Sequence, residues 1–105
     1  MFKYTKHTLK KAESLFDRIK YTVRYERGNF QSGYCIVENK RIAVINKFYD
    51  IEARINCLIE ILGKADLASE EIEALEEKEQ ELYHQLTEVY ADRQETTANP
   101  TIENP

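Results

Sequence analysis

The alternation of hydrophobic and polar positions predicts a helix followed directly by a strand at the beginning of the chain. Over residues 8–20 the apolar side chains recur every three or four positions, and Thr8 is suited to cap the helix. Residues 21–26 alternate strictly between apolar and polar side chains, which is typical of a half-buried strand. The apolar positions of the helix are Leu9, Ala12, Leu15, Phe16 and Ile19.

Two further strands and a second helix follow. Apolar runs at residues 34–38 and 41–46 are separated by two residues that suit a hairpin turn. Because the connections between strands are short, we expect the three strands to form an antiparallel meander. Asp50 then caps a helix over residues 51–62, and Gly63 is placed to end it.

The acidic segment at residues 64–94 predicts a third helix, which starts after Ser69 and ends near Arg93. Its apolar residues follow a heptad pattern, in which Glu79 occupies one position of the seam. The seam packs either on the helix's own domain or against the same helix of a second copy, which would give a homodimer. The residues of this seam are Ile72, Leu75, Leu82, Leu86 and Val89.

The predicted fold is therefore α+β, with one helix, a three-stranded antiparallel meander, a second helix and the long acidic C-terminal helix. Residues 1–94 make a single domain, and a chain of this size can bury one modest core. Residues 95–105 contain two Asn-Pro pairs and little that is apolar, so we expect a disordered tail.

The charges divide the chain into a basic body and an acidic C-terminal part. Residues 1–64 carry 13 Lys/Arg and 7 Asp/Glu, whereas residues 65–105 carry 2 and 12. Arginines and tyrosines on the sheet suggest a nucleic-acid-binding module that uses a basic, aromatic sheet face as a stacking platform. Against this alternative, the pI of about 5.2 and the acidic helix oppose phosphate binding.

The composition points to the cytoplasm. The first residues lack the apolar run of a signal peptide, and no stretch is long and apolar enough to span a membrane. Cys35 and Cys57 lie in apolar segments at a spacing that matches neither a disulfide framework nor a zinc motif. We therefore expect two buried thiols in a reducing compartment.

The best candidate for a ligand site is the loop over residues 27–33. It combines a cation, amide side chains, a phenylalanine and two glycines that permit close approach of the backbone. The alternative is a plain connection between strands, with Phe30 folded back on the core. The residues of this candidate loop are Arg27, Gly28, Asn29, Phe30, Gln31 and Gly33.

The sequence contains no motif for metal binding or for catalysis. His7 and His84 have no cysteine or histidine at ligand spacing, so we predict no metal site and no cofactor. Cys57 is expected to be buried and inert among apolar residues, and Glu60 to pair with Lys64 four residues on. An enzyme would need a site assembled from distant elements, and we predict no catalytic residue.

The segments at residues 41–46 and 52–60 resemble one part of the zinc metallopeptidases of the ImmA/IrrE type. The resemblance places Glu60 at the catalytic glutamate of that family, and Ile59 and Gly63 at its two zinc-binding histidines. Both ligands are absent, so the resemblance implies a related scaffold without metal or peptidase activity. The whole chain also resembles short bacterial proteins with a Gly-x-Phe-x-x-Gly-Tyr-Cys segment, a family that supplies no function.

The favoured interpretation is a non-enzymatic protein-interaction module that self-associates through its C-terminal helix, with a further protein partner left open. The nucleic-acid-binding module and the small enzyme remain the alternatives.

Overall fold

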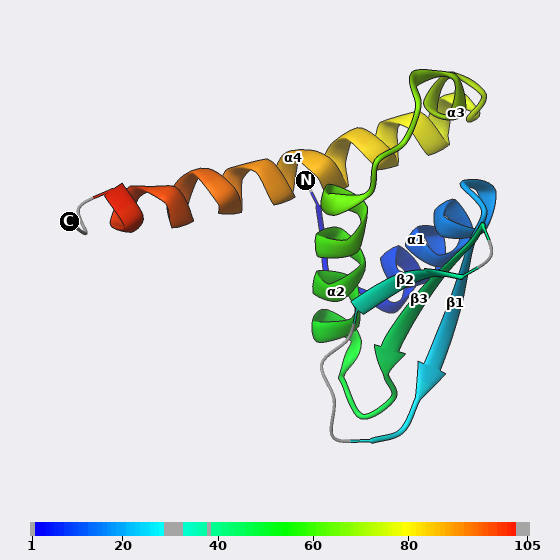
Figure 1. The fold of residues 1–105 in the computed structure, drawn as a ribbon, viewed down its shortest axis with the longest axis horizontal. Coiled ribbons are helices and arrows are strands. Elements are labelled where there is room, and N and C mark those ends of the chain that lie inside the picture. Colours follow the sequence, from blue (N-terminus) through cyan, green and yellow to red (C-terminus); the bar gives the residue numbers. More distant parts are fainter. Residues whose placement is uncertain (1, 29–32, 38, 103–105) are drawn as a thin grey trace.

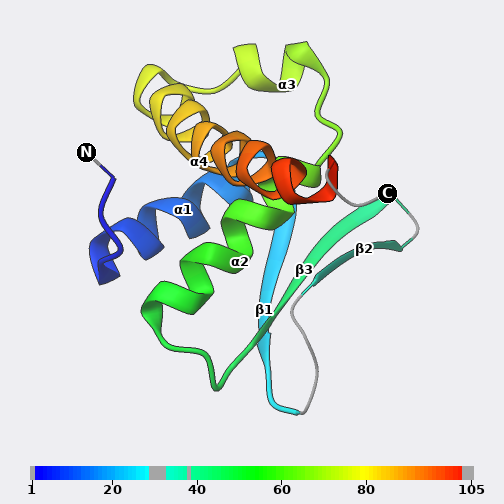
Figure 2. The same ribbon diagram turned by 90° about the vertical axis from the view of Figure 1, so that its left-hand side faces the viewer.

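The computed structural model describes residues 2–28, 33–37 and 39–102, with the backbone alone for residues 34–37 and 95–102. These residues form an α+β fold in which α1 and α2 cover one face of a small sheet and α4 crosses over both helices (Figures 1 and 2). The helices are α1 (Lys6–Arg18), α2 (Ile51–Lys64), α3 (Ser69–Glu73) and α4 (Glu77–Ile102). The strands are β1 (Tyr21–Glu26), β2 (Gly33–Val37) and β3 (Lys40–Asn46).

The prediction of an antiparallel meander is wrong, because the sheet is mixed and has the order β1-β3-β2. Strand β2 pairs with β3 in the antiparallel sense, but β1 pairs with β3 in the parallel sense, with Tyr21 opposite Arg41. The physical reason lies in β3, whose continuous apolar run suits the central position of a sheet. Strand β1 carries the exposed Arg24 and alternates, which suits an edge.

The core lies between the sheet and the helices. The inward side chains of the sheet include Tyr21, Ala43 and Ile45, and they meet apolar side chains of α1 and α2. Helix α4 closes the other side of these helices and adds Leu82 and Leu86 to the same core. The members of α1 and α2 that are buried in this core are Leu9, Ala12, Leu15, Phe16, Ile55, Leu58, Ile59, Ile61 and Leu62.

The acidic segment forms two helices where one was predicted. Helix α3 ends at Glu73, and the chain turns before α4 begins at Glu77. At this turn Glu79 Oε1 accepts a hydrogen bond from the Glu76 amide at 2.9 Å, which satisfies a backbone donor at the start of α4. Glu79 also pairs with Arg18 of α1 at 3.1 Å, so its carboxylate lies at the helix start and at an ion pair.

The C-terminal ends of α4 and α2 also differ from the predicted ends. Helix α4 continues to Ile102, so residues 95–102 are helical where a disordered tail was expected, and this end of α4 extends away from the body (Figure 1). Helix α2 passes through Gly63 and ends at Lys64. The reason for a glycine at this position is the ring of Tyr90, which lies so close that a Cβ atom on Gly63 would overlap it.

Candidate functional site

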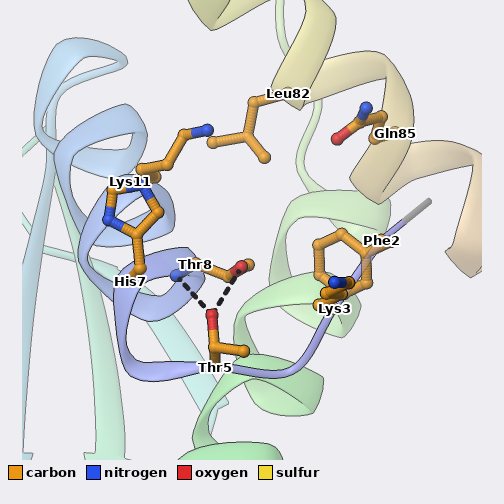
Figure 3. Close-up of a pocket in the computed structure, with 8 residues that line it drawn as sticks. All are labelled: Phe2, Lys3, Thr5, His7, Thr8, Lys11, Leu82 and Gln85. Carbon is orange, nitrogen blue, oxygen red and sulfur yellow. Dashed lines mark hydrogen bonds between the residues drawn. The ribbon is translucent and has the colours of Figure 1, made fainter.

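Several exposed cations lie around a groove between the N-terminal segment, α1 and α4 (Figure 3). A hollow of about 270 Å³ lies here, and Leu82 and Phe2 form its apolar part. A second hollow of about 250 Å³ shares Lys11, Leu82 and Gln85 with the first, so the two adjoin. We call this surface the basic groove; it is lined by Phe2, Lys3, Thr5, His7, Thr8, Lys11, Lys78, Glu81, Leu82 and Gln85.

The start of α1 sets one wall of the groove. Thr5 caps the helix, and its hydroxyl oxygen accepts a hydrogen bond from the Thr8 amide at 3.2 Å. The predicted cap, Thr8, is therefore wrong. Helix α1 starts earlier, at Lys6, so Lys6 and His7 lie in its first turn. Because Leu9 faces the core, His7 and Lys11 lie on the opposite side of α1, one turn apart, and the Lys11 side chain reaches toward Leu82 of α4 (Figure 3).

Contacts from α4 hold the N-terminal segment in place as the other wall. The guanidinium of Arg93 donates hydrogen bonds to the Tyr4 hydroxyl at 2.8 Å and to Asn56 Oδ1 at 2.6 Å. The Phe2 and Tyr4 rings meet edge to face at 5.0 Å between centroids. These contacts connect residues 2–4 to α2 and α4, so the groove is formed by segments far apart in the chain.

The electrostatics of this region are unfavourable for the isolated chain. The first turn of α1 has no acidic residue and carries Lys6, although the helix dipole disfavours positive charge there. Lys10 lies one turn after Lys6 and next to Lys11, so like charges are neighbours on the helix. All of these side chains are exposed, and none forms an ion pair with any described residue. An anionic partner would relieve this repulsion.

The seam predicted for a dimer is used within the chain. Leu75, Leu82 and Leu86 are buried in the chain's own core, with Leu86 fully inaccessible. Val89 packs against the same core, and Ile72 is half-buried. An association through these same side chains would therefore require α4 to leave its place on α1 and α2.

The candidate loop at residues 27–33 is described only at its ends. Arg27 is exposed, and the Gly28 carbonyl accepts a hydrogen bond from the buried Asn46 side chain at 3.0 Å. Gly33 is the first residue of β2. Asn29, Phe30 and Gln31 lie outside the described residues.

The tyrosines of β1 face the helices, where they cannot offer a stacking platform on the outer face of the sheet. Tyr21 is buried, and Tyr25 donates a short hydrogen bond to Glu13 of α1. The Arg54 guanidinium lies 4.8 Å from the centroid of the Tyr25 ring. Burial, and next the hydrogen bond to Glu13, raise the pKa of Tyr25 well above its ordinary value of 10.0.

Arg54 also closes the connection between β3 and α2. It donates hydrogen bonds to the carbonyl oxygens of Tyr49 and Lys47, both at 2.9 Å. Together with Tyr25 and Glu13, it joins α1, β1 and α2. This polar cluster therefore holds three elements together, which is a structural role.

The positions that the metallopeptidase resemblance singles out hold no ligand set. Ile59 is fully buried, Gly63 is covered by Tyr90, and Glu60 is exposed and 3.1 Å from the Lys64 ammonium. Cys57 is half-buried and packs against the core. Within the described part of the chain, no group of three or more His, Cys, Asp or Glu could hold a metal ion. Nor is any helix of that part long and apolar enough to cross a membrane.

Sequence reasoning missed the basic groove. The signal was present, since Lys3, Lys6, Lys10 and Lys11 repeat at helical spacing before the first acidic residue, Glu13. The wall from α4 could not be predicted, because it is brought there by the tertiary fold.

No family model matches the chain, and searches of the curated proteins and of the solved structures also give no match.

Proposed function

We propose that this chain is a protein-interaction module that binds an acidic protein segment in the basic groove. The observation that carries the proposal is the gathering of three exposed lysines around the groove, none of which forms an ion pair with a described residue; they are Lys3, Lys11 and Lys78. A chain that keeps such locally unfavourable charges around a groove is typical of a binding surface. Carboxylates of a partner would neutralise these cations and interact favourably with the start of α1.

Two features favour a protein segment over a nucleic acid. The groove has an apolar part, Phe2 and Leu82, which can pack against an aliphatic or aromatic side chain of a peptide. Its far end carries Glu81, whose carboxylate would repel a phosphate backbone and attract a lysine. Tyr21 and Tyr25 of β1, which could otherwise stack on bases, face the helices.

The test is binding of a fluorescein-labelled peptide rich in glutamate with one phenylalanine, followed by fluorescence anisotropy. We expect salt-sensitive binding that the double variant Lys3→Glu/Lys11→Glu weakens by about tenfold or more, because two attractive contacts become repulsive. The matched control is Lys20→Glu/Lys40→Glu, which makes the same change of net charge at exposed lysines outside the groove. It should retain most of the affinity.

Two results would contradict the proposal. One is equal weakening by the groove variant and the control, which would mean that net charge alone governs binding. The other is tighter binding of a single-stranded oligonucleotide than of the peptide, lost in Lys3→Glu/Lys11→Glu. That outcome would assign the groove to nucleic acid.

A further inference from the structure

We infer that the acidic segment bound by the basic groove belongs to a second copy of this chain, so that the protein forms a symmetric dimer through charge. The inference rests on the function proposed above and names its partner. It concerns a surface different from the heptad seam, which the chain buries in its own core.

The acidic half of this interface lies where α3 meets α4. Four exposed carboxylates of this corner form no ion pair with any described residue. The two carboxylates beside them are already engaged, Glu71 with Arg41 and Glu79 with Arg18. The remaining charge is therefore open to an external partner. We call this surface the acidic corner; it consists of Glu70, Glu73, Glu76 and Glu77.

The two charged surfaces adjoin on the same molecule. Lys11 of α1 and Lys78 and Glu81 of α4 line one hollow, and Glu77 begins the helix that carries the last two. A two-fold axis near this hollow would place the basic groove of each copy against the acidic corner of the other. Such self-complementarity is what a symmetric dimer requires, because each contact is then made twice.

The long-range charge of the chain supports the same arrangement. Residues 1–64 and 65–105 carry opposite net charges, and within the chain only some of the carboxylates are neutralised by arginines. Two copies related by a two-fold axis bring the opposite charges together and the like charges apart. Attraction of this kind acts between exposed groups, so it weakens as salt shortens the Debye length.

The experiment measures the mass of the full chain in solution by light scattering, at about 0.05 M and about 0.5 M salt. We expect a dimer at low salt that dissociates at high salt. The variants Lys3→Glu/Lys11→Glu, in the basic groove, and Glu73→Lys/Glu77→Lys, in the acidic corner, should each be monomeric at low salt, because each makes both contacts repulsive. An equimolar mixture of the two variants should form a heterodimer, since one contact is then native and the other has both charges exchanged. Restored association also shows that both variants are folded.

Three outcomes would overturn the inference. A parent chain that stays monomeric at low salt, or a dimer that both variants retain, excludes the charge-mediated interface. Failure of the mixture to associate when circular dichroism shows both variants folded excludes the pairing of these two surfaces. The peptide assay separates this failure from that of the proposed function: a monomer that still binds the acidic peptide through Lys3 and Lys11 keeps the function and loses only the second copy as partner.

Discussion

Replacing Gly63 by alanine tests the docking of α4 on α2. Gly63 lies in the last turn of α2, and a Cβ atom at this position would lie well inside 3.0 Å of three atoms of the Tyr90 ring. One of these atoms is Cγ, at the base of the ring, so rotation of the ring cannot remove the overlap. Helix α4 would have to retreat from α2, and with it the leucines that it contributes to the core.

The expected change in the free energy of unfolding follows from two opposing effects of the substitution. In a helix without such a neighbour, Gly→Ala stabilises by up to about 1 kcal/mol, because alanine loses less backbone entropy on folding. Overpacking of a core contact costs about 1–3 kcal/mol. We therefore expect Gly63→Ala to lower the free energy of unfolding by about 1–2 kcal/mol. The sign is opposite to the one that helix propensity alone predicts.

The assay is urea denaturation followed by circular dichroism, which yields the midpoint and the slope. Tyr90→Ala provides the matched background, because it removes the ring that the new methyl group would meet. In that background Gly63→Ala should be neutral or stabilising, and the two substitutions should show a coupling free energy of about 2 kcal/mol. A Gly63→Ala protein as stable as the parent, or one equally destabilised in both backgrounds, would refute the packing of Tyr90 on Gly63.

Three other substitutions test the remaining contacts. Leu86→Ala should lower the free energy of unfolding by about 2–5 kcal/mol in the same assay, because Leu86 is fully buried; a loss well below 1 kcal/mol would contradict its place in the core. Tyr25→Phe should cost about 1 kcal/mol through the lost hydrogen bond to Glu13. The raised pKa of Tyr25 makes the parent lose stability as pH rises above the ordinary value of 10.0, and the variant should lack this component in alkaline urea titrations. Arg41 lowers the pKa of Glu71 through its hydrogen bonds, so the pair stabilises the parent above pH 4.5 and this stabilisation is lost as pH falls through the lower folded value. Arg41→Ala should therefore cost about 1 kcal/mol at pH 7, with a difference from the parent that shrinks in acid; a difference independent of pH would argue against the ion pair.

The sequence predicts local structure where the pattern is local, and it fails where distant segments meet. Helices α1 and α2 and strand β1 follow from periodicity, and strands β2 and β3 follow from their apolar runs. The pairing of β1 with β3 was missed, although the continuous apolar run at residues 42–45 indicates a central strand. Short connections favour hairpins, but β2 pairs with β3, and β1 lies on the other side of β3.

The heptad seam shows a second limit of the same kind. Leu75, Leu82 and Leu86 have the spacing of an association helix, but the spacing does not say which apolar surface they meet. The turn before Glu77 contains Leu75, at which the longest step of the seam begins. Gly63 carried the missing information, because a glycine inside a helix indicates close approach by another segment.

The arginines and the lysines of the basic body differ in how they interact with the acidic segment. Arginines connect the acidic segment to the body: Arg41 makes a bidentate pair with Glu71 while also donating to the Ile19 carbonyl, and Arg18 pairs with Glu79. The planar guanidinium suits such contacts because its donors match a carboxylate in fixed geometry. Every lysine, by contrast, is exposed, and those of the basic groove form no ion pair with a described residue. The arginines therefore provide the ion pairs that connect the acidic segment to the body, and the lysines of α1 take no part in them. A partner that carries carboxylates would give these lysines a binding role.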